Sequence, residues 1–198
     1  MAQAGGRIVE TVKNSIVASI RGTGEVANAV VDTVSGTLVN AIRGTGAVGT
    51  ALTSTVSDVV RGAIQGTAQV GGDVGTAAKD GMLGVIRGTK EVGVETTETI
   101  AASASAVVKG ASEVGGNVGS AARHAVEGAI NGAREVGLNA EQSASAAASG
   151  AIKGAGDISA TAVEEVRKAV TGVIDGVKVV VKEPFRSEET RKQDRKAG

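Results

Sequence analysis

The sequence has 198 residues, with 21 basic and 21 acidic side chains, one Phe, no Trp, no Tyr and no Cys. Its zero net charge argues against a nucleic-acid-binding protein, which needs a basic surface, and the absence of Cys excludes disulfides and thiolate metal sites. Because the apolar residues are almost all Ala, Val and Ile, the chain can bury a thin apolar stripe but lacks the bulky side chains of a thick core.

Residues 1–6 precede the regular part of the chain, and we expect them to form a flexible N-terminal segment. The opening MAQAGGRIVE has no apolar signal-peptide core, and Ala2 stands where N-myristoylation needs Gly. No stretch approaches the roughly 18 consecutive apolar residues of a transmembrane helix. We therefore expect a cytoplasmic protein that can bind lipid surfaces peripherally.

A 22-residue repeat occupies residues 7–181 in eight copies. Each copy has a glycine at the same position, from Gly22 to Gly176, with Ile or Val two residues before it and Val or Ile four residues after it. Since 11 residues over three turns correspond to about 3.67 residues per turn, a repeat of two such units predicts an amphipathic α-helix. The predicted apolar stripe consists of Ile20, Val26, Ile42, Val48, Ile64, Val70, Ile86, Val92, Val108, Val114, Ile130, Val136, Ile152, Ile158 and Ile174.

The repeat predicts an all-α fold without β-sheet. We expect long amphipathic helices that run through several repeats, either elongated or folded back as an antiparallel helical bundle with coiled-coil-like packing. A solenoid of short helices that turns at every repeat glycine is not expected. The glycine-dense segments VGGDVG (70–75) and VGGNVG (114–119) suit hinge points between the long helices.

The polar face of the predicted helix carries charges in a regular order. Basic and acidic residues four apart, such as Arg87 with Glu91 and Lys109 with Glu113, predict ion pairs within one helix. Threonine also recurs, but its two series fall on different sides of the helix. We therefore regard ice binding as a less favoured function.

Ten glycines form G-x-x-x-G pairs, most of them at repeat junctions. Small residues four apart let another helix backbone approach closely, so these glycines predict helix–helix contact. Alternatively, they keep the isolated helix marginal, because each internal Gly costs about 1 kcal/mol relative to Ala. The predicted close-packing glycines are Gly62, Gly66, Gly84, Gly88, Gly128, Gly132, Gly150, Gly154, Gly172 and Gly176.

No catalytic group of residues is apparent in the sequence. Residues 44–49, GTGAVG, fit the G-x-G-x-x-G pattern of a dinucleotide-binding turn, but the first glycine belongs to the repeat and no separate βαβ unit surrounds it. His124 is the only histidine and cannot by itself form a triad or an imidazole-rich metal site. We therefore expect no catalytic residue, no cofactor and no metal, and a protein that is not an enzyme.

Residues 182–198 differ in composition from the repeats. Pro184 cannot continue a helix interior, and the residues after it are rich in both charges and have no apolar period. We expect this segment to be a disordered, solubilising tail.

The segment GVIRGTKEVGVETTETI (84–100) resembles the 11-residue repeats of the perilipin family of lipid-droplet coat proteins. The same pattern of Gly, Val and Thr with few aromatics occurs in the synucleins, and the repeats are also similar to those of late-embryogenesis-abundant stress proteins. The resemblance implies amphipathic helices that coat an apolar surface, such as a lipid droplet, a membrane leaflet or a hydrophobic granule.

Two functions are therefore open from the sequence, and the first of them is favoured. In the first, a structural amphipathic protein binds lipid or another apolar surface, and many weak repeats add up to firm attachment. In the second, a soluble, self-associating helical bundle closes the stripe against other helices and acts in stress protection or as a scaffold. Neither function involves nucleic acid.

Overall fold

The computed structural model describes residues 2–46, 49–94 and 97–181, and the chain has the all-α fold that the repeat predicts. The helices are α1 (Ala2–Thr23), α2 (Val26–Thr45), α3 (Thr50–Gln69), α4 (Val74–Glu91), α5 (Thr97–Glu113), α6 (Val118–Val136), α7 (Ala140–Gly156) and α8 (Ala160–Val170). Two short strands, β1 (Gly172–Ile174) and β2 (Val177–Val179), follow α8. Within these ranges, no helix is long and apolar enough to cross a membrane.

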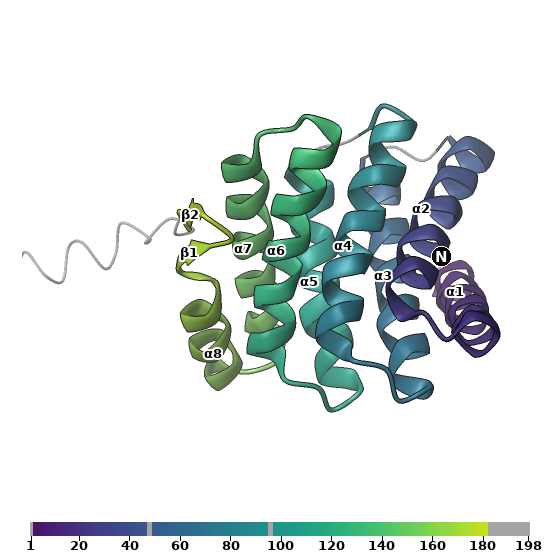
Figure 1. Cartoon of the computed structure of the whole chain (residues 1–198), viewed down its shortest axis with the longest axis horizontal. Coiled ribbons are helices and arrows are strands. Elements are labelled where there is room, and N and C mark those ends of the chain that lie inside the picture. The colour runs from purple at the N-terminus through teal and green to yellow at the C-terminus, as the bar shows by residue number, and fades with distance from the viewer. Residues whose placement is uncertain (1, 47–48, 95–96, 182–198) are drawn as a thin grey trace, which may run out of the picture.

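The helices are arranged in two layers (Figure 1). Successive helices run in opposite directions, so helices two places apart in the chain are parallel. One layer contains α1, α3, α5 and α7, each packed on the next, and the other contains α2, α4, α6 and α8 in the same way. The N-terminus lies at one end of this array, and the two strands lie at the other end.

Of the two expected arrangements the chain has the folded-back helical bundle, but each repeat forms its own helix and turn, so the helices are shorter than expected. The turns do not fall at the repeat glycines of α3 to α7, which lie inside those helices, but mostly five residues later. Gly71 and Gly115 there have φ of 73° and 72°, a left-handed conformation that suits glycine and often ends helices. The predicted hinges VGGDVG and VGGNVG are therefore the turns from α3 to α4 and from α5 to α6.

The residue two positions after each of these glycines caps the start of the next helix. The side chain of Asp73 accepts a hydrogen bond from the backbone N–H of Thr76 at 2.6 Å, and Asn117 accepts one from Ser120 at 2.6 Å. Each bond satisfies an N–H at the helix start that has no partner within the helix. The same bond lowers the pKa of Asp73. A helix-ending Gly and a helix-starting Asp or Asn thus recur with the period of the repeat.

The core lies between the two layers and is built mainly from small side chains. It contains many fully buried Ala residues together with Val and Ile, and its largest members include Leu38, Ile64 and Met82. Because these side chains are small, neighbouring helices can approach closely and still fill the space between them. The apolar residues of one repeat are therefore covered by other repeats of the same chain.

The last repeat departs from the predicted fold. β1 and β2 form an antiparallel pair with Ile174 opposite Val177. Asp175 and Gly176 connect them with φ of 46° and 76°, which is the pattern of a two-residue type I′ turn. The prediction of no β-sheet is wrong at this point, because the alternating sequence VIDGVKV with Asp-Gly at its centre favours a hairpin over a helix.

The limits of the helical region also differ from the expected ones. α1 begins at Ala2, inside the segment 1–6 that we expected to be flexible. Residues 182–198, expected to form a charged tail, lie outside the described residues. The described repeats form one continuous array from α1 to the hairpin.

Candidate functional site

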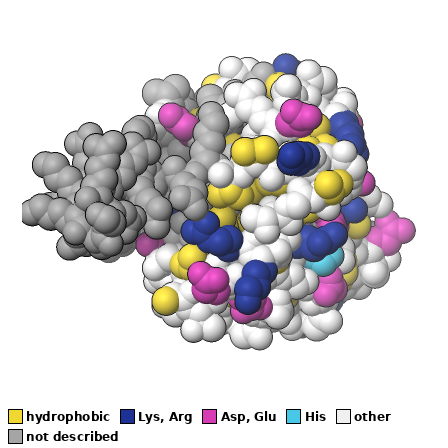
Figure 2. Space-filling model, turned by 90° about the vertical axis from the view of Figure 1, so that its left-hand side faces the viewer, with side chains coloured by type: hydrophobic (Ala, Val, Ile, Leu, Met, Phe, Trp, Pro, Cys, Tyr) yellow, Lys and Arg dark blue, Asp and Glu magenta, His cyan; other side chains and the backbone are white. Residues whose placement is uncertain are grey.

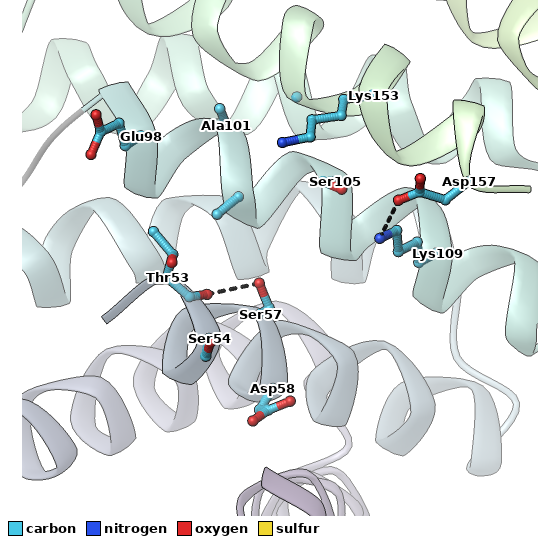
Figure 3. Close-up of a pocket in the computed structure, with 12 residues that line it drawn as sticks. Thr53, Ser54, Ser57, Asp58, Glu98, Ala101, Ser105, Lys109, Lys153 and Asp157 are labelled. Atoms are coloured by element: carbon cyan, nitrogen blue, oxygen red, sulfur yellow. Dashed lines mark hydrogen bonds and ion pairs between the residues drawn. The ribbon is translucent and has the colours of Figure 1, made fainter. Parts of the chain in front are cut away.

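A groove of about 580 Å³ crosses the outer face of the layer formed by α3, α5 and α7 (Figure 3). Its residues come from three repeats and are mostly small or charged. The groove is lined by Thr53, Ser54, Ser57 and Asp58 of α3, by Glu98, Ala101, Ala102, Ser105 and Lys109 of α5, and by Gly150, Lys153 and the adjoining Asp157 of α7.

The groove exists because the middle helix presents small side chains to solvent. Ala101 and Ser105 lie on α5, where the backbone of α7 comes very close. A Cβ added to Gly154 would lie 2.7 Å from the carbonyl oxygen of Ser105, and one added to Gly150 would overlap the carbonyl of Ala101. The glycines of α7 therefore keep the helices close, and the α5 side chains at these contacts, Ala101 and Ser105, are too short to fill the groove.

The charges of the groove are arranged in opposite pairs. Lys109 and Asp157 form an ion pair of 2.5 Å between Nζ and Oδ2, and this contact lowers the pKa of Asp157. On the other side, burial raises the pKa of Asp58, partly opposed by the positive charge of Arg61. The groove thus presents both positive and negative side chains to a ligand.

The hydroxyl groups of the groove provide hydrogen-bonding capacity. Ser57 Oγ donates to the backbone carbonyl of Thr53 at 2.8 Å, which leaves its lone pairs to accept a further bond. Chemically, this arrangement can bind a polar, extended segment through hydroxyls and charged side chains. Within the described ranges, no group of three or more His, Asp or Glu residues could hold a metal ion.

A second feature is a ladder of ion pairs between helices two places apart. The ladder consists of three pairs in which the acidic residue lies 48 residues after the basic one: Arg43 with Glu91, Arg87 with Glu135 and Lys109 with Asp157. A further pair between α3 and α5, Arg61 with Glu113, has a spacing of 52 residues. The predicted partners lie four residues after the basic one. The expected pairs of Arg87 with Glu91 and of Lys109 with Glu113 are therefore replaced by pairs with the equivalent residue two repeats later. The repeat places the basic residue of one helix level with an acidic residue of the helix two places later, so opposite charges face each other.

The structure places most residues of the predicted apolar stripe inward. Six are buried, namely Ile42, Ile64, Ile86, Val108, Ile130 and, in β1, Ile174. Seven are half-buried, namely Ile20, Val26, Val70, Val92, Val114, Val136 and Ile152. Ile158, between α7 and α8, is exposed, and Val48 lies outside the described residues.

Four of the five predicted glycine pairs lie at contacts between helices of the same layer. Gly62 and Gly66 of α3 face α1, Gly84 and Gly88 of α4 face α2, Gly128 and Gly132 of α6 face α4, and Gly150 and Gly154 of α7 face α5. At Gly62 and Gly84 an added Cβ would lie 2.7 and 2.8 Å from a carbonyl oxygen of the neighbouring helix. Gly172 and Gly176 belong to the hairpin, so the helix–helix pair expected there does not form.

Two polar residues lie apart from the groove. His124 on α6 lies with Nδ1 2.9 Å from the carbonyl oxygen of Ser120 on its own helix, and beside Gly75 at the start of α4. Asp80 on α4 is 9 % exposed, and its Oδ2 is buried without a hydrogen-bond partner. Burial raises the pKa of Asp80. Neither residue was a predicted functional residue, and an isolated Asp in a repeat gives no sequence signal of its burial.

Comparison with known proteins found no matching family model, no similar curated protein and no similar solved structure. The resemblance to perilipin, synuclein and late-embryogenesis-abundant repeats stays a prediction from the repeat pattern. What the protein does must be inferred from the geometry of the groove, the ladder and the covered stripe.

Proposed function

We propose that this protein is a non-enzymatic scaffold, a folded helical array that presents a polar groove to a protein partner. The observation that supports this proposal best is the covering of the apolar stripe. Ile64 and Val108 are 0 % exposed and Ile86 is 1 % exposed. A stripe covered in this way is not available to a lipid surface unless the array opens, so the soluble bundle is favoured over the coat.

The shape of the array also supports a scaffold. Stacked helical repeats bind partners along extended surfaces formed by several repeats, and the groove takes residues from α3, α5 and α7. Ser57, Ser105 and Lys153 provide hydroxyl and ammonium groups along it. The backbone of an extended peptide carries the N–H and C=O groups that such side chains can bind. We therefore infer that the partner contributes an extended polar segment.

The coat function remains the second candidate because of the composition of the core. Ala and Gly fill much of the contact between helices, and small side chains contribute less burial free energy than Leu or Phe. An array held in this way could open on an apolar surface and expose the same stripe to it. The scaffold requires that the array is folded in water, whereas the coat requires that it opens on an apolar surface.

Circular dichroism and flotation together test the proposal. The scaffold predicts full helicity and a cooperative thermal transition in buffer, and no flotation of the protein with triglyceride emulsion or phosphatidylcholine vesicles. A protein that is unfolded in buffer and gains helix on either surface would contradict the scaffold and support the coat.

Peptide selection tests the groove itself. Peptides selected against the intact protein from a random display library should lose binding to Ser105→Arg, which fills the groove. They should keep binding to Ser120→Arg, which places the same side chain on the exposed start of α6. Equal binding to both variants would show that the groove is not the binding surface.

A further inference from the structure

We propose that the β1–β2 hairpin is a cap that ends the helical array, and that the α7 face it covers is a docking surface for the N-terminal end of a second copy of this chain. Each helix packs on the helix two places before it, so a ninth helix would pack on α7. β2 packs on α7 instead. Figure 2 shows this end of the molecule, where hydrophobic side chains lie among charged ones.

The hairpin is held firmly in this place. Ile174, Val177 and Val179 are buried against the core. Arg134 of α6 donates to the Asp175 carboxylate at 2.7 Å and to its backbone carbonyl at 2.8 Å. In the seven earlier repeats the position of Asp175 is occupied by Arg, Lys, Gln or Asn. The negative charge of Asp175 therefore stabilises the hairpin, and it cannot take the place of the basic residue that the ladder has at this position.

The α7 face beneath the hairpin has the features of an internal helix contact. Ser145 and Ser149 are half-buried and line a groove of about 570 Å³ between α7 and the hairpin residues Lys178 and Val180. They lie 44 residues after the α5 positions on which the glycine pair of α7 packs, which is two repeats. A helix that packs on α7 in the way that α7 packs on α5 would therefore contact Ser145 and Ser149.

The N-terminal end of the array presents the complementary face. Within the described residues, α1 packs on no helix two places before it, and Ala18 and Gly22 are exposed on it. A Cβ added to Gly22 would meet no atom within 4 Å, in contrast to the glycines of the internal pairs. Where a second copy continues the array, counting the repeat onward places its Ala18 and Gly22 opposite Ser145 and Ser149 of the first.

The charges at the two ends are also complementary in this register. Each rung of the ladder joins a basic residue to an acidic residue 48 positions later, and the next basic residue after Lys109 at the same repeat position is Lys153. Counted in the same way, the partner of Lys153 is Glu25 of the second copy. Both residues are exposed within one chain. The contact between copies would thus repeat the packing and the ion pairing that hold α5 and α7 together.

The experiment opens the cap in the full-length chain. Asp175→Pro removes the turn, because Pro cannot adopt the positive φ of this position, whereas Asp175→Asn tolerates that φ and keeps an oxygen acceptor for Arg134. Sedimentation velocity over a range of concentrations is expected to show a monomer for the wild type and for Asp175→Asn. Asp175→Pro should form head-to-tail oligomers that grow with concentration, with the helical circular dichroism signal retained.

A charge swap distinguishes this contact from unspecific adhesion. Lys153→Glu in the Asp175→Pro background should weaken association about tenfold, as for one close charge pair, and the further change Glu25→Lys should restore it. Arg134→Ala opens the cap without altering the turn and should associate to a smaller extent. A fully helical Asp175→Pro that stays monomeric would overturn the proposal, as would association unaffected by Lys153→Glu. Loss of helix content in both Asp175→Pro and Arg134→Ala would overturn it too, because a cap is not required to fold the helices it covers.

Discussion

Arg87 on α4 donates two hydrogen bonds to Glu135 on α6, of 2.6 Å from Nε to Oε1 and 2.9 Å from Nη2 to Oε2. The pair raises the pKa of Arg87 and lowers that of Glu135. Since the two residues are two repeats apart plus four positions, the contact joins equivalent faces of neighbouring parallel helices. It is therefore a marker of the array and not of an isolated helix.

A double-mutant cycle of Arg87→Gln and Glu135→Gln should give a coupling free energy of about 0.5–1 kcal/mol. The value is modest because both side chains are about two-fifths exposed and water and salt screen the charges. Urea unfolding at low and high salt measures it, and high salt should reduce it. A cycle of Arg87→Gln with Glu91→Gln is the matched control and should give no coupling; if it gave the larger value, the ladder would be wrong.

Two glycine substitutions should have opposite effects on stability. Gly150→Ala should destabilise the protein by about 1–3 kcal/mol, because the added methyl overlaps the backbone of α5 at Ala101. Gly36→Ala lies in the interior of α2 with no atom within 4 Å of the added Cβ, and should stabilise it by up to about 1 kcal/mol. Thermal or urea unfolding measures both. Equal effects of the two changes would show that the close contact of α5 and α7 is absent.

The turn before α7 depends on its capping residue. Asn139 accepts a hydrogen bond from the backbone N–H of Gln142 at 2.8 Å, so Asn139→Ala should lower the free energy of unfolding by about 1 kcal/mol. Asn139→Asp keeps the acceptor and should cost much less. If the two variants were equally stable in urea unfolding, the cap would contribute nothing.

The buried Asp80 should make stability depend on pH. Burial raises the pKa of Asp80 in the folded state above its ordinary value, so the folded protein holds this proton more tightly than the unfolded chain. This contribution is fully present below the unfolded pKa and is lost as the pH rises through the folded pKa. Asp80→Asn should therefore be more stable than the wild type near pH 7, and the difference should shrink on acidification. Unfolding curves at several pH values check this, and a difference that grows at low pH would contradict it.

The helical content could be predicted from the sequence, but the length of each helix could not. An 11-residue period suits a helix of any length, and the glycines that mark the repeat most clearly lie inside the helices and not at their ends. The signal was present in VGGDVG and VGGNVG, where Gly71 and Gly115 are followed two residues later by Asp73 and Asn117. A helix-ending glycine followed by a helix-capping residue indicates two helices joined by a turn.

The inward direction of the stripe was predictable, whereas its partner was not. Ile64 and Ile86 lie on the apolar face of any helix with this period, but the sequence does not say whether lipid or another helix covers them. The groove could not be found because it depends on how closely α5 and α7 approach. The hairpin was missed because Ile174 and Gly176 continue the repeat spacing, although Asp175-Gly176 between alternating Val and Ile residues is a direct hairpin signal.

The repeats fold back on one another and cover their own stripe, and one distance across the array tests whether they do so in water. Since the chain has no Cys, spin labels at Arg43→Cys and Glu91→Cys report one distance, between positions that form an ion pair in the wild type. Double electron–electron resonance in buffer should give a short distance set by the label linkers. A continuous helix through the same 48 residues would separate the two positions by about 72 Å, and a distance of that order in buffer would contradict the folded array.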